Sequence, residues 1–423
     1  MQRQFWVETL GCPKNQVDSD KLTGTLLADG MTRAEHPQDA DIVVVNTCAF
    51  VEQARQESID TILSFDDLRK EGSKLVVTGC LAERYGKELA ESLPEVDQVA
   101  GFGVPVTLGR KADTGSDRVG SDQIVSKFDL LELPRPPSEA PWAYVKVAEG
   151  CDRNCGFCAI PTFRGKQRSR ALGSILAEID QLGAREIVLV AQDLASYGRD
   201  QGQGERRIIE LVRQAATRAD WVRLLYLYPS DLTDALVDAV LSTGVPYFDL
   251  SLQHVSRPLL RRMRRWGDGE IFLDRMGHIR SLEPGATFRS NFIVGYPGET
   301  EDDHDALIEF VREARLDWCG FFAYSPEEGT YAIDLDGEVP ASLVAERLDE
   351  LSELQDRITS EARDALIGAS VRVLVDRPGE ARSYREAPEI DGIIAVPIDL
   401  PVGEFVTLHV VEATGPDLMA VRW

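Results

Sequence analysis

Three cysteines stand close together in the segment Cys151-Asp-Arg-Asn-Cys155-Gly-Phe-Cys158. Thiols at spacings of four and three residues can turn toward one point if the chain coils around it. A closed tetrahedral zinc site needs four ligands, and no fourth Cys or His stands near this segment in the sequence. Closely spaced thiolates also hold iron–sulfur clusters, and a four-iron cluster bound by three of them leaves one iron open to a small molecule. We therefore favour an open-site cluster over the alternatives, a redox pair or a zinc knuckle.

Three further cysteines, Cys12, Cys48 and Cys80, each come directly after a strand-like run. These runs are residues 5–11, 41–47 and 74–79, and helix-like segments separate them. Alternating strands and helices predict a parallel sheet, and ligands bind at the carboxyl edge of such a sheet. One such cysteine alone would more often be a small buried hydrophobe. Because all three follow the end of a strand, we expect them to converge there and to hold a second iron–sulfur cluster.

The middle of the chain repeats a pattern of a short apolar run followed by an amphipathic segment. The runs are residues 144–147, 186–190, 222–227, 247–252, 289–294 and 318–324. Repeated strand–helix units predict an open (β/α)6 partial barrel, whose active face lies at the carboxyl ends of the strands. The candidate residues on those strands and at their ends are Gln192, Asp193, Tyr228, Gln253, His254, Arg289, Asn291 and Gly295. For His254 we expect a structural hydrogen bond rather than a catalytic role.

The ends of this middle part are marked by composition. Four prolines within residues 134–141 predict a stiff linker and a domain boundary. At the other end, a long charged helix is expected over residues 341–367, and the strands expected after it predict a small antiparallel barrel that presents a face and loops to polymers. Residues 369–423 hold five arginines and no lysine against nine acidic residues. Barrels that bind nucleic acid need a basic groove with stacking aromatics, so this charge favours a basic protein partner.

The whole chain is also acidic, with 46 Lys and Arg residues against 71 Asp and Glu residues and a net charge of −25. A field of this sign repels phosphate backbones, so nucleic acid is an unlikely substrate. No apolar run approaches the ~20 residues of a membrane span, and no signal-peptide pattern follows Met1. The seven cysteines form no disulfide-like framework. We expect a cytoplasmic protein of two or three domains without a membrane partner.

The spacing CxxxCxxC after a strand, with Phe157 before the third cysteine, resembles the signature of the radical S-adenosylmethionine enzymes. The N-terminal part resembles one branch of them, the methylthiotransferases, in the blocks Thr9-Leu-Gly-Cys12 with Asn15 and Asp18-Ser19, Asn46-Thr-Cys48, and Thr78-Gly-Cys80. Gly11-Cys-Pro-Lys-Asn15 looks like the form found in the branch that modifies a ribosomal protein, because the tRNA-modifying branch usually carries Gln-Met-Asn after the cysteine. The C-terminal part resembles a TRAM domain, an OB-like barrel, and its residues 382–392 are again similar to the ribosomal-protein branch.

The resemblance implies two [4Fe-4S] clusters and S-adenosylmethionine as cofactors. The cluster at Cys151, Cys155 and Cys158 would bind the cofactor and generate a deoxyadenosyl radical, and the cluster at Cys12, Cys48 and Cys80 would carry the sulfur of the methylthio group. Family positions similar to Gln192, Asp193, Arg289 and Asn291 contact S-adenosylmethionine. Arg164 and Arg170 are expected either to meet an acid group of the cofactor or substrate, or to form a solvated basic loop.

The resemblance further implies a methylthiotransferase domain over residues 1–133, the linker 134–141, a radical SAM partial barrel over 142–357 and a TRAM domain over 358–423. The implied substrate is an aspartate of the twelfth protein of the small ribosomal subunit, whose unactivated β-carbon calls for radical chemistry from a cofactor. This basic protein would dock on the acidic TRAM domain, and an external electron donor and sulfur source are needed. The alternatives are a tRNA adenosine methylthiotransferase and a non-catalytic iron–sulfur electron carrier or scaffold.

Overall fold

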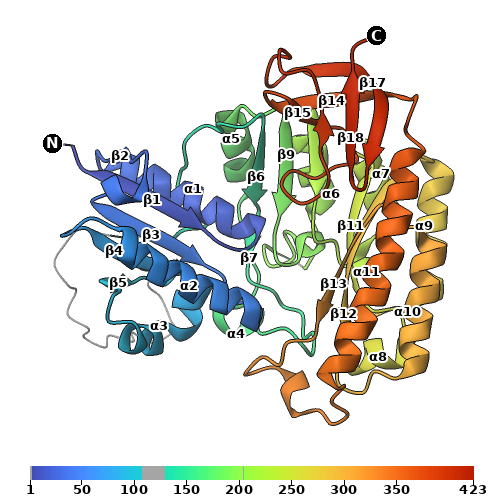
Figure 1. The fold of residues 1–423 in the computed structure, drawn as a ribbon, viewed down its shortest axis with the longest axis horizontal. Helices are drawn as coiled ribbons and strands as arrows, with labels where there is room; N and C mark the ends of the chain where they lie inside the picture. Colours follow the sequence, from blue (N-terminus) through green and yellow to red (C-terminus); the bar gives the residue numbers. More distant parts are fainter. Residues whose placement is uncertain (1, 107–128, 203) are drawn as a thin grey trace. The chain divides into compact units, whose positions relative to one another are not determined.

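The computed structural model describes residues 2–106, 129–202 and 204–423 (Figure 1). Its packing divides the chain into two compact units, one formed by Met1–Pro137 with Thr162–Gly165 and the other by Ser138–Pro161 with Lys166–Trp423. The junction after Pro137 falls inside the proline-rich stretch at 134–141. The finer domain limits remain a prediction, and part of the N-terminal one, residues 107–128, lies outside the described residues.

The first unit is built on a parallel sheet. Across it, the strands lie in the order β2 (Thr32–Arg33), β1 (Gln4–Thr9), β3 (Ile42–Thr47), β4 (Lys74–Gly79) and β5 (Gln98–Val99). Every residue of β3 is buried, as expected for a central parallel strand that is covered on both faces. The predicted N-terminal parallel sheet is therefore confirmed.

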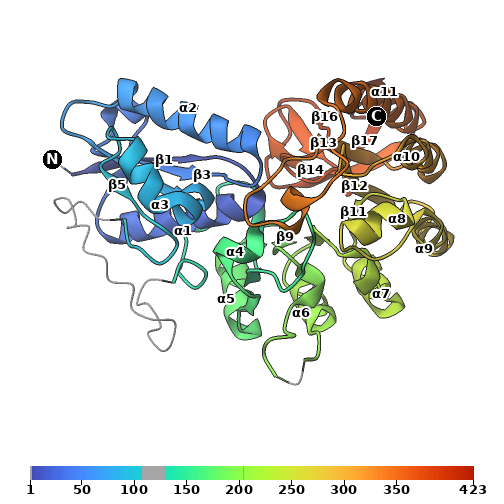
Figure 2. The same ribbon diagram turned by 90° about the horizontal axis from the view of Figure 1, so that it is seen from below.

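Helices cover both faces of this sheet because successive side chains of a strand point to opposite sides. Ile42 and Val44 of β3 pack in one apolar core with α1 (Pro13–Ala28). Val43 and Val45 pack in another with α2 (Glu52–Leu68) and α3 (Cys80–Ser92). Figure 2 shows α1 and α2 on opposite sides of the strands. The carboxyl ends of β1, β3 and β4 thus share one edge of the sheet.

The second unit holds the predicted partial barrel, which is confirmed. Its parallel strands follow the chain order: β6 (Trp142–Lys146), β9 (Glu186–Val190), β10 (Trp221–Leu224), β11 (Tyr247–Gln253), β12 (Thr287–Val294) and β13 (Trp318–Ala323). A bridge between Leu227 and Leu250 joins the β10 side to β11. Besides the short α4 (Ile160–Arg164), the helices between and after them in the chain are α5 (Leu172–Leu182), α6 (Ile208–Ala215), α7 (Asp234–Leu241), α8 (Arg257–Arg262), α9 (Gly269–Leu282), α10 (Glu301–Ala314) and α11 (Ala341–Asp364).

Alternation along these strands separates an apolar face from a polar one. Side chains such as Ile187, Leu189, Phe248 and Phe292 pack with the helices in one continuous core. Figure 2 shows these helices along the outside of the strands. The opposite face of the strands carries polar residues, for example Asp249 and Arg289, whose side chains are paired with each other at 3.3 Å.

The C-terminal strands close into a small barrel in the order β14 (Ser370–Arg377), β15 (Glu380–Arg382), β16 (Ile394–Ala395), β18 (Asp417–Val421) and β17 (Phe405–Thr414). The expected antiparallel pairing holds around this barrel except between β16 and β18, which run parallel. The predicted start of the TRAM domain at residue 358 falls inside α11, so the long helix reaches across that limit.

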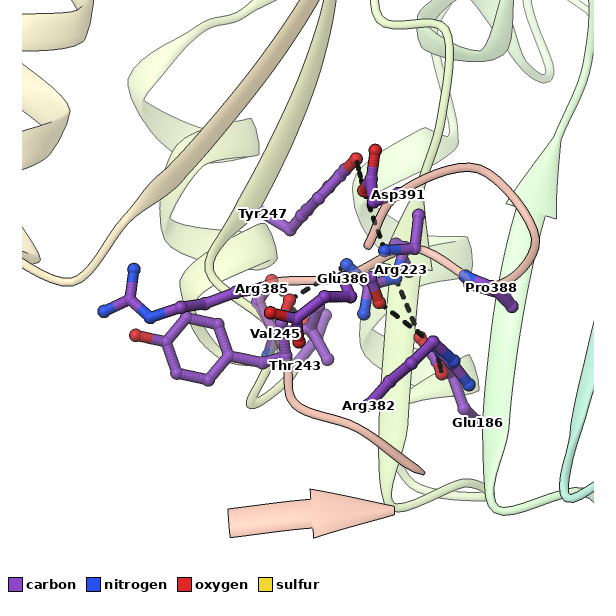
Figure 3. Close-up of polar contacts among 12 residues, drawn as sticks. Glu186, Arg223, Thr243, Val245, Tyr247, Arg382, Arg385, Glu386, Pro388 and Asp391 are labelled. Carbon is purple, nitrogen blue, oxygen red and sulfur yellow. Dashed lines mark hydrogen bonds and ion pairs between the residues drawn. The ribbon is translucent and has the colours of Figure 1, made fainter. Parts of the chain in front are cut away.

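Residues 382–391 of this small barrel, here named the floor segment, contact residues of the partial-barrel strands, and Figure 3 shows Glu186, Arg223 and Tyr247 among them. Arg382 pairs with Glu186 of β9 at 2.8 Å, and Asp391 accepts a 2.6 Å hydrogen bond from the hydroxyl of Tyr247 on β11. The other contacts run from Tyr144 to the Pro388 carbonyl, from Arg223 to the Tyr384 carbonyl, from Arg289 to Asp391, and from Trp318 to the Arg385 carbonyl. Through these contacts the C-terminal barrel reaches β6 and β9 to β13, so it is joined to the partial barrel by specific polar contacts.

Candidate functional site

Cys12, Cys48 and Cys80 come together at the shared strand edge of the first unit. Cys12 is the N-cap of α1, Cys48 follows β3 directly, and Cys80 begins α3 after β4. Burial raises the pKa of the Cys48 thiol to about 12, and the charges of Cys12 and Cys80 add to the rise. The three sulfur atoms are therefore within electrostatic reach of one another, as the strand-end pattern predicts.

Two glycines make this close approach possible. Gly11 has φ 92°, and a Cβ there would lie 2.9 Å from the Cβ of Cys48. Gly79 has φ 91°, and a Cβ there would lie 2.3 Å from Oδ1 of Asn46. Because a side chain would strain the backbone and clash at both positions, only glycine fits before Cys12 and before Cys80.

Two buried asparagines hold the loops that carry these cysteines. The amide of Asn15 donates to the carbonyls of Leu10 and Thr47, at 2.9 and 3.0 Å. The amide of Asn46 in turn donates to the carbonyl of Asn15 at 2.8 Å. These bonds tie the loop after β1 to the end of β3, which explains physically why asparagines accompany the cysteines in the sequence blocks.

A buried arginine reaches the same cysteines. Arg164 ends α4 (Ile160–Arg164), and its guanidinium donates to Sγ of Cys80 at 2.9 Å. Burial opposes ionisation of Cys12, yet Lys14, Arg164 and backbone N–H groups together lower the pKa of its thiol. Burial raises the pKa of Cys80 even though Arg164 acts against the rise. The alternative that Arg164 lies in a solvated loop is wrong, because its side chain is buried in the first unit beside Cys80. Its contact with an acid group of the cofactor or substrate stays a prediction.

Cys151, Cys155 and Cys158 occupy the loop between β7 (Ala148–Glu149) and α4. Burial raises the pKa of Cys151 to about 11 and that of Cys158 to about 12, and neighbouring cysteine charges contribute to both. Within this loop the backbone N–H of Arg153 donates to Sγ of Cys151 at 3.4 Å. The raised pKa values of Cys151 and Cys158 favour their protonated forms, and a bound metal would be needed to hold these two as thiolates.

Arg153 anchors the cysteine loop to the strand ends of the partial barrel. Its guanidinium pairs with Asp193 after β9 at 2.6 Å and with Asp231 after β10. It also stacks on the ring of Tyr228, 3.8 Å from the centroid. Asp193 is therefore paired within the protein, and Tyr228 helps to hold the loop that carries Cys151, Cys155 and Cys158 through its contact with Arg153.

A second arginine supports the loop from the other end. Arg265 donates to Sγ of Cys155 at 3.3 Å and to the carbonyl of Ser251, and it lies 4.2 Å from the centroid of the Tyr228 ring. Gly156 donates its N–H to the carbonyl of Met263 at 2.8 Å. A Cβ at Gly156 would lie 2.8 Å from the hydroxyl of Tyr296, so the chain passes here without room for a side chain.

The donor sets fit iron–sulfur clusters better than single metal ions. Across residues 2–106, 129–202 and 204–423, no three His, Cys, Asp or Glu side chains converge as ligands of one ion. A cluster is bound through several iron atoms, so its thiolates need not meet at one point. Each site offers three grouped thiols, with arginine donors directed at the sulfurs of Cys80 and Cys155. Thiolates with outer hydrogen-bond donors are the usual environment of such clusters.

Unpartnered acceptors near the strand ends fit a cofactor that carries an ammonium group and hydroxyls. Among the described residues, Oε1 of Gln192, Oδ1 of Asp193 and Oδ1 of Asn291 are buried and accept no hydrogen bond. The amide of Gln192 is oriented by a 2.8 Å bond to Glu149. Arg289 differs from these three, since both its ion pairs, to Asp249 and Asp391 at 3.3 Å, are with the protein.

The other candidates have structural surroundings. The Nδ1 of His254 accepts the N–H of Ser256 at 3.1 Å, which is the structural hydrogen bond expected for it. Arg170 pairs with Glu178 at 2.7 Å and is buried, so the alternative of a solvated loop is wrong for it too, and its contact with an acid group stays a prediction. Gly295 donates its N–H to Glu299 in a tight turn before α10. Cys319, the seventh cysteine and a member of neither set of three, packs against the partial-barrel core.

The sequence reasoning missed the arginines that hold the cysteine loops. Arg153 stands inside the CxxxCxxC segment, and its position between ligands was a usable signal. Arg265 comes far along the chain, in the run Arg264-Arg265-Trp266, and only the fold brings it to Cys155.

Comparison with family models agrees with this architecture. The model described as "Uncharacterized protein family UPF0004" matches residues 4–101, that of the radical SAM superfamily matches 145–311, and that of the TRAM domain matches 367–422. The radical SAM and TRAM predictions are thereby confirmed. No helix in the described part of the chain is both long and apolar enough to cross a membrane.

Curated relatives match the chain over nearly all of its length. A ribosomal protein uS12 methylthiotransferase RimO of Moorella thermoacetica is 42% identical and covers 96% of each chain. Proteins of the same name from Cutibacterium acnes and Myxococcus xanthus are each 40% identical, over 97% and 99% of this chain and 96% and 91% of theirs.

Proposed function

Because the chain belongs to the family of ribosomal protein uS12 methylthiotransferases, we propose that it transfers a methylthio group to the β-carbon of an aspartate in uS12. It is a radical SAM transferase. The relatives named here act by name on a ribosomal protein, so the tRNA alternative is not retained.

The observation that carries the two-cluster proposal is the presence of three grouped cysteines in each compact unit. In this proposal Cys151, Cys155 and Cys158 hold one [4Fe-4S] cluster, and Cys12, Cys48 and Cys80 hold the other. When bound, the clusters and S-adenosylmethionine supply a radical able to take hydrogen from an unactivated carbon and a sulfur that can be methylated and transferred.

The protein's own residues hold and orient these groups. Arg153 and Arg265 fix the loop that carries Cys151 and Cys155 against the strand ends of the partial barrel. Arg153 donates a hydrogen bond to Cys151, and Arg265 donates one to Cys155. The buried acceptors on Gln192, Asp193 and Asn291 would receive hydrogen bonds from the ammonium and hydroxyl groups of the cofactor. Arg289, which is paired with two carboxylates, would help to shape the same cofactor site and would add a positive charge to it.

The C-terminal barrel would dock the basic substrate protein through its exposed acids. Glu386 and Asp391 cannot take part, because their side chains are buried in the floor segment. The exposed carboxylates of this barrel are those of Glu389, Asp399, Glu404 and Glu412. An interface of this kind gains association rate from charge attraction and weakens as salt rises. An external reductant and an external sulfur source complete the reaction, which takes place in the cytoplasm where ribosomes are found.

The test is to reconstitute the protein anaerobically and incubate it with S-adenosylmethionine, reductant, sulfide and purified uS12. We expect about eight irons per chain and a uS12 aspartate that gains a methylthio group by mass spectrometry. The variant in which Cys151, Cys155 and Cys158 are all alanine should keep about four irons and modify nothing. A protein that binds iron but neither cleaves the cofactor nor modifies uS12 would be an electron carrier or scaffold instead.

A further inference from the structure

Arg164 belongs in sequence to the segment after Cys158 but lies in the other compact unit, with the other cysteines. The packing assigns Thr162–Gly165 to the first unit. The Arg164 side chain is only 3% exposed, and its Nη2 donates both to Sγ of Cys80 at 2.9 Å and to Oδ1 of Asn15 at 3.0 Å. One stretch of sequence therefore supplies ligands for one cysteine set and a hydrogen-bond donor for the other.

The remaining surroundings of Arg164 fix its guanidinium in place. The ring of Phe102 lies 4.4 Å from the guanidinium carbon, and Asp18, with a 1% exposed side chain, lies 3.8 Å from Nη1. Asn15 is held in turn by its bonds to the Leu10 and Thr47 carbonyls. A planar fork held by a ring, a carboxylate, an amide and a sulfur is a site for arginine and not for lysine.

Such an arginine has a defined effect on a thiolate-bound cluster. N–H donors to cysteine sulfur and nearby positive charge stabilise the more negative, reduced state, and both are known ways in which proteins set cluster potentials. The charge also matters for holding the thiolates, because buried anions need a paired cation. Arg164 directs an N–H at Cys80 and brings a positive charge with it.

We propose that Arg164 is a positioning residue of the Cys12, Cys48 and Cys80 site, where it holds Cys80 and raises the reduction potential of the group bound there. This inference rests on the proposed function, since it assumes that these cysteines bind an iron–sulfur cluster. It assigns to the segment after Cys158 a role at the sulfur-carrying site.

The experiment isolates that site in the full chain by using the Cys151, Cys155 and Cys158 triple-alanine protein as the parent. Arg164→Gln and Arg164→Lys are introduced into it. Arg69→Gln serves as control, because Arg69 is a partly buried arginine of the first unit that pairs with Asp66 and Asp97. Iron per chain, the electron paramagnetic resonance spectrum of the reduced cluster and its midpoint potential are measured for each protein.

We expect Arg164→Gln to lower the midpoint potential or to lose most of its iron while the protein stays folded, and Arg164→Lys to shift the potential in the same direction by less. Arg69→Gln should match the parent. Identical potentials and iron contents in the parent and both Arg164 variants would overturn the inference. If Arg164→Gln does not fold, Arg164→Lys decides alone, and equality with the parent rejects the proposal. A parent that binds no iron would instead reject the proposed second cluster, which keeps the two failures distinct.

Discussion

The phenol of Tyr247 on β11 donates a 2.6 Å hydrogen bond to Asp391 of the C-terminal barrel, and the same carboxylate pairs with Arg289 at 3.3 Å. Both partners of Asp391 lie on strands of the partial barrel, Tyr247 on β11 and Arg289 on β12, and Figure 3 shows the contact with Tyr247. A residue of the TRAM domain is thus built into the interior polar face of the radical SAM domain.

Replacing Asp391 with alanine should therefore destabilise the partial barrel and not only the small one. The change leaves Arg289 with Asp249 alone in a buried setting, and breaking a buried pair in this way costs about 3–5 kcal/mol. Tyr247→Phe, which removes only the hydrogen bond, should cost about 1–2 kcal/mol. Urea unfolding measures both, and Asp399→Ala, at an exposed pair with Arg422, should cost less than about 1 kcal/mol. A cost for Asp391→Ala as small as that of the control would contradict the role of the floor segment.

Single cysteine variants should separate the two chemical steps. Cys155→Ala should abolish deoxyadenosine formation, because the cluster of the radical SAM domain loses a ligand. Cys48→Ala should leave deoxyadenosine formation intact and stop methylthio transfer to uS12. Both products are measured by mass spectrometry in the same reaction. Loss of both activities in a folded Cys48→Ala protein would show that the roles are not separate.

Arg153→Leu should weaken the radical-generating site without touching the other cysteines. The change removes the ion pairs to Asp193 and Asp231 and the stacking on Tyr228. Outer-shell changes of this kind typically cost 10–100-fold in metal affinity or activity. Deoxyadenosine formation should fall by that factor, while Arg207→Leu, at an exposed pair with Glu210, should not change it. Equal rates in the two variants would remove Arg153 from the site.

Gly79→Ala should disrupt the sulfur-carrying site through the backbone. The positive φ and the clash with Asn46 and the Thr47 carbonyl should cost about 2–4 kcal/mol and lower iron binding. Gly86→Ala is the matched change, since Gly86 lies in α3, where a Cβ would make an ordinary 3.9 Å contact with Cγ1 of Val99, and the variant should gain about 0.5–1 kcal/mol. Thermal unfolding distinguishes the two, and a tolerated Gly79→Ala would mean that the strand edge is not as tightly packed as described.

His254 should make stability fall on acidification. Burial, with Asp303 acting against it, lowers the pKa of His254 to about 4, below its unfolded value of about 6.5. The unfolded state therefore binds more protons between these values, so the contribution is fully present above pH ~6.5 and is lost as pH falls toward 4, by at most about 3 kcal/mol. We expect the unfolding free energy to depend less steeply on pH in His254→Asn. His278→Asn, whose side chain is 48% exposed, should keep the original slope. An unchanged slope in His254→Asn would assign the pH dependence to other groups.

The sequence by itself determined the architecture and the grouping of the cysteines. Cys12, Cys48 and Cys80 could be assigned to one edge because parallel strands bring their carboxyl ends together, whatever their distance along the chain. The six apolar runs, each followed by an amphipathic segment, predicted the partial barrel because repeated strand–helix units form parallel sheets. Periodicity and strand order are properties of the local sequence, so they can be recognised before any contact is known.

Only the tertiary structure decided which side chains surround the cysteines and what the C-terminal barrel does for the partial barrel. Arg164 was placed with the cysteines before it by sequence proximity, whereas packing puts it on Cys80. Arg265 reaches Cys155 across more than a hundred residues, and Asp391 reaches Arg289 from another domain. Long flexible side chains carry their charge several ångströms from the backbone, so their partners are set by three-dimensional packing and leave no periodic signal in the sequence.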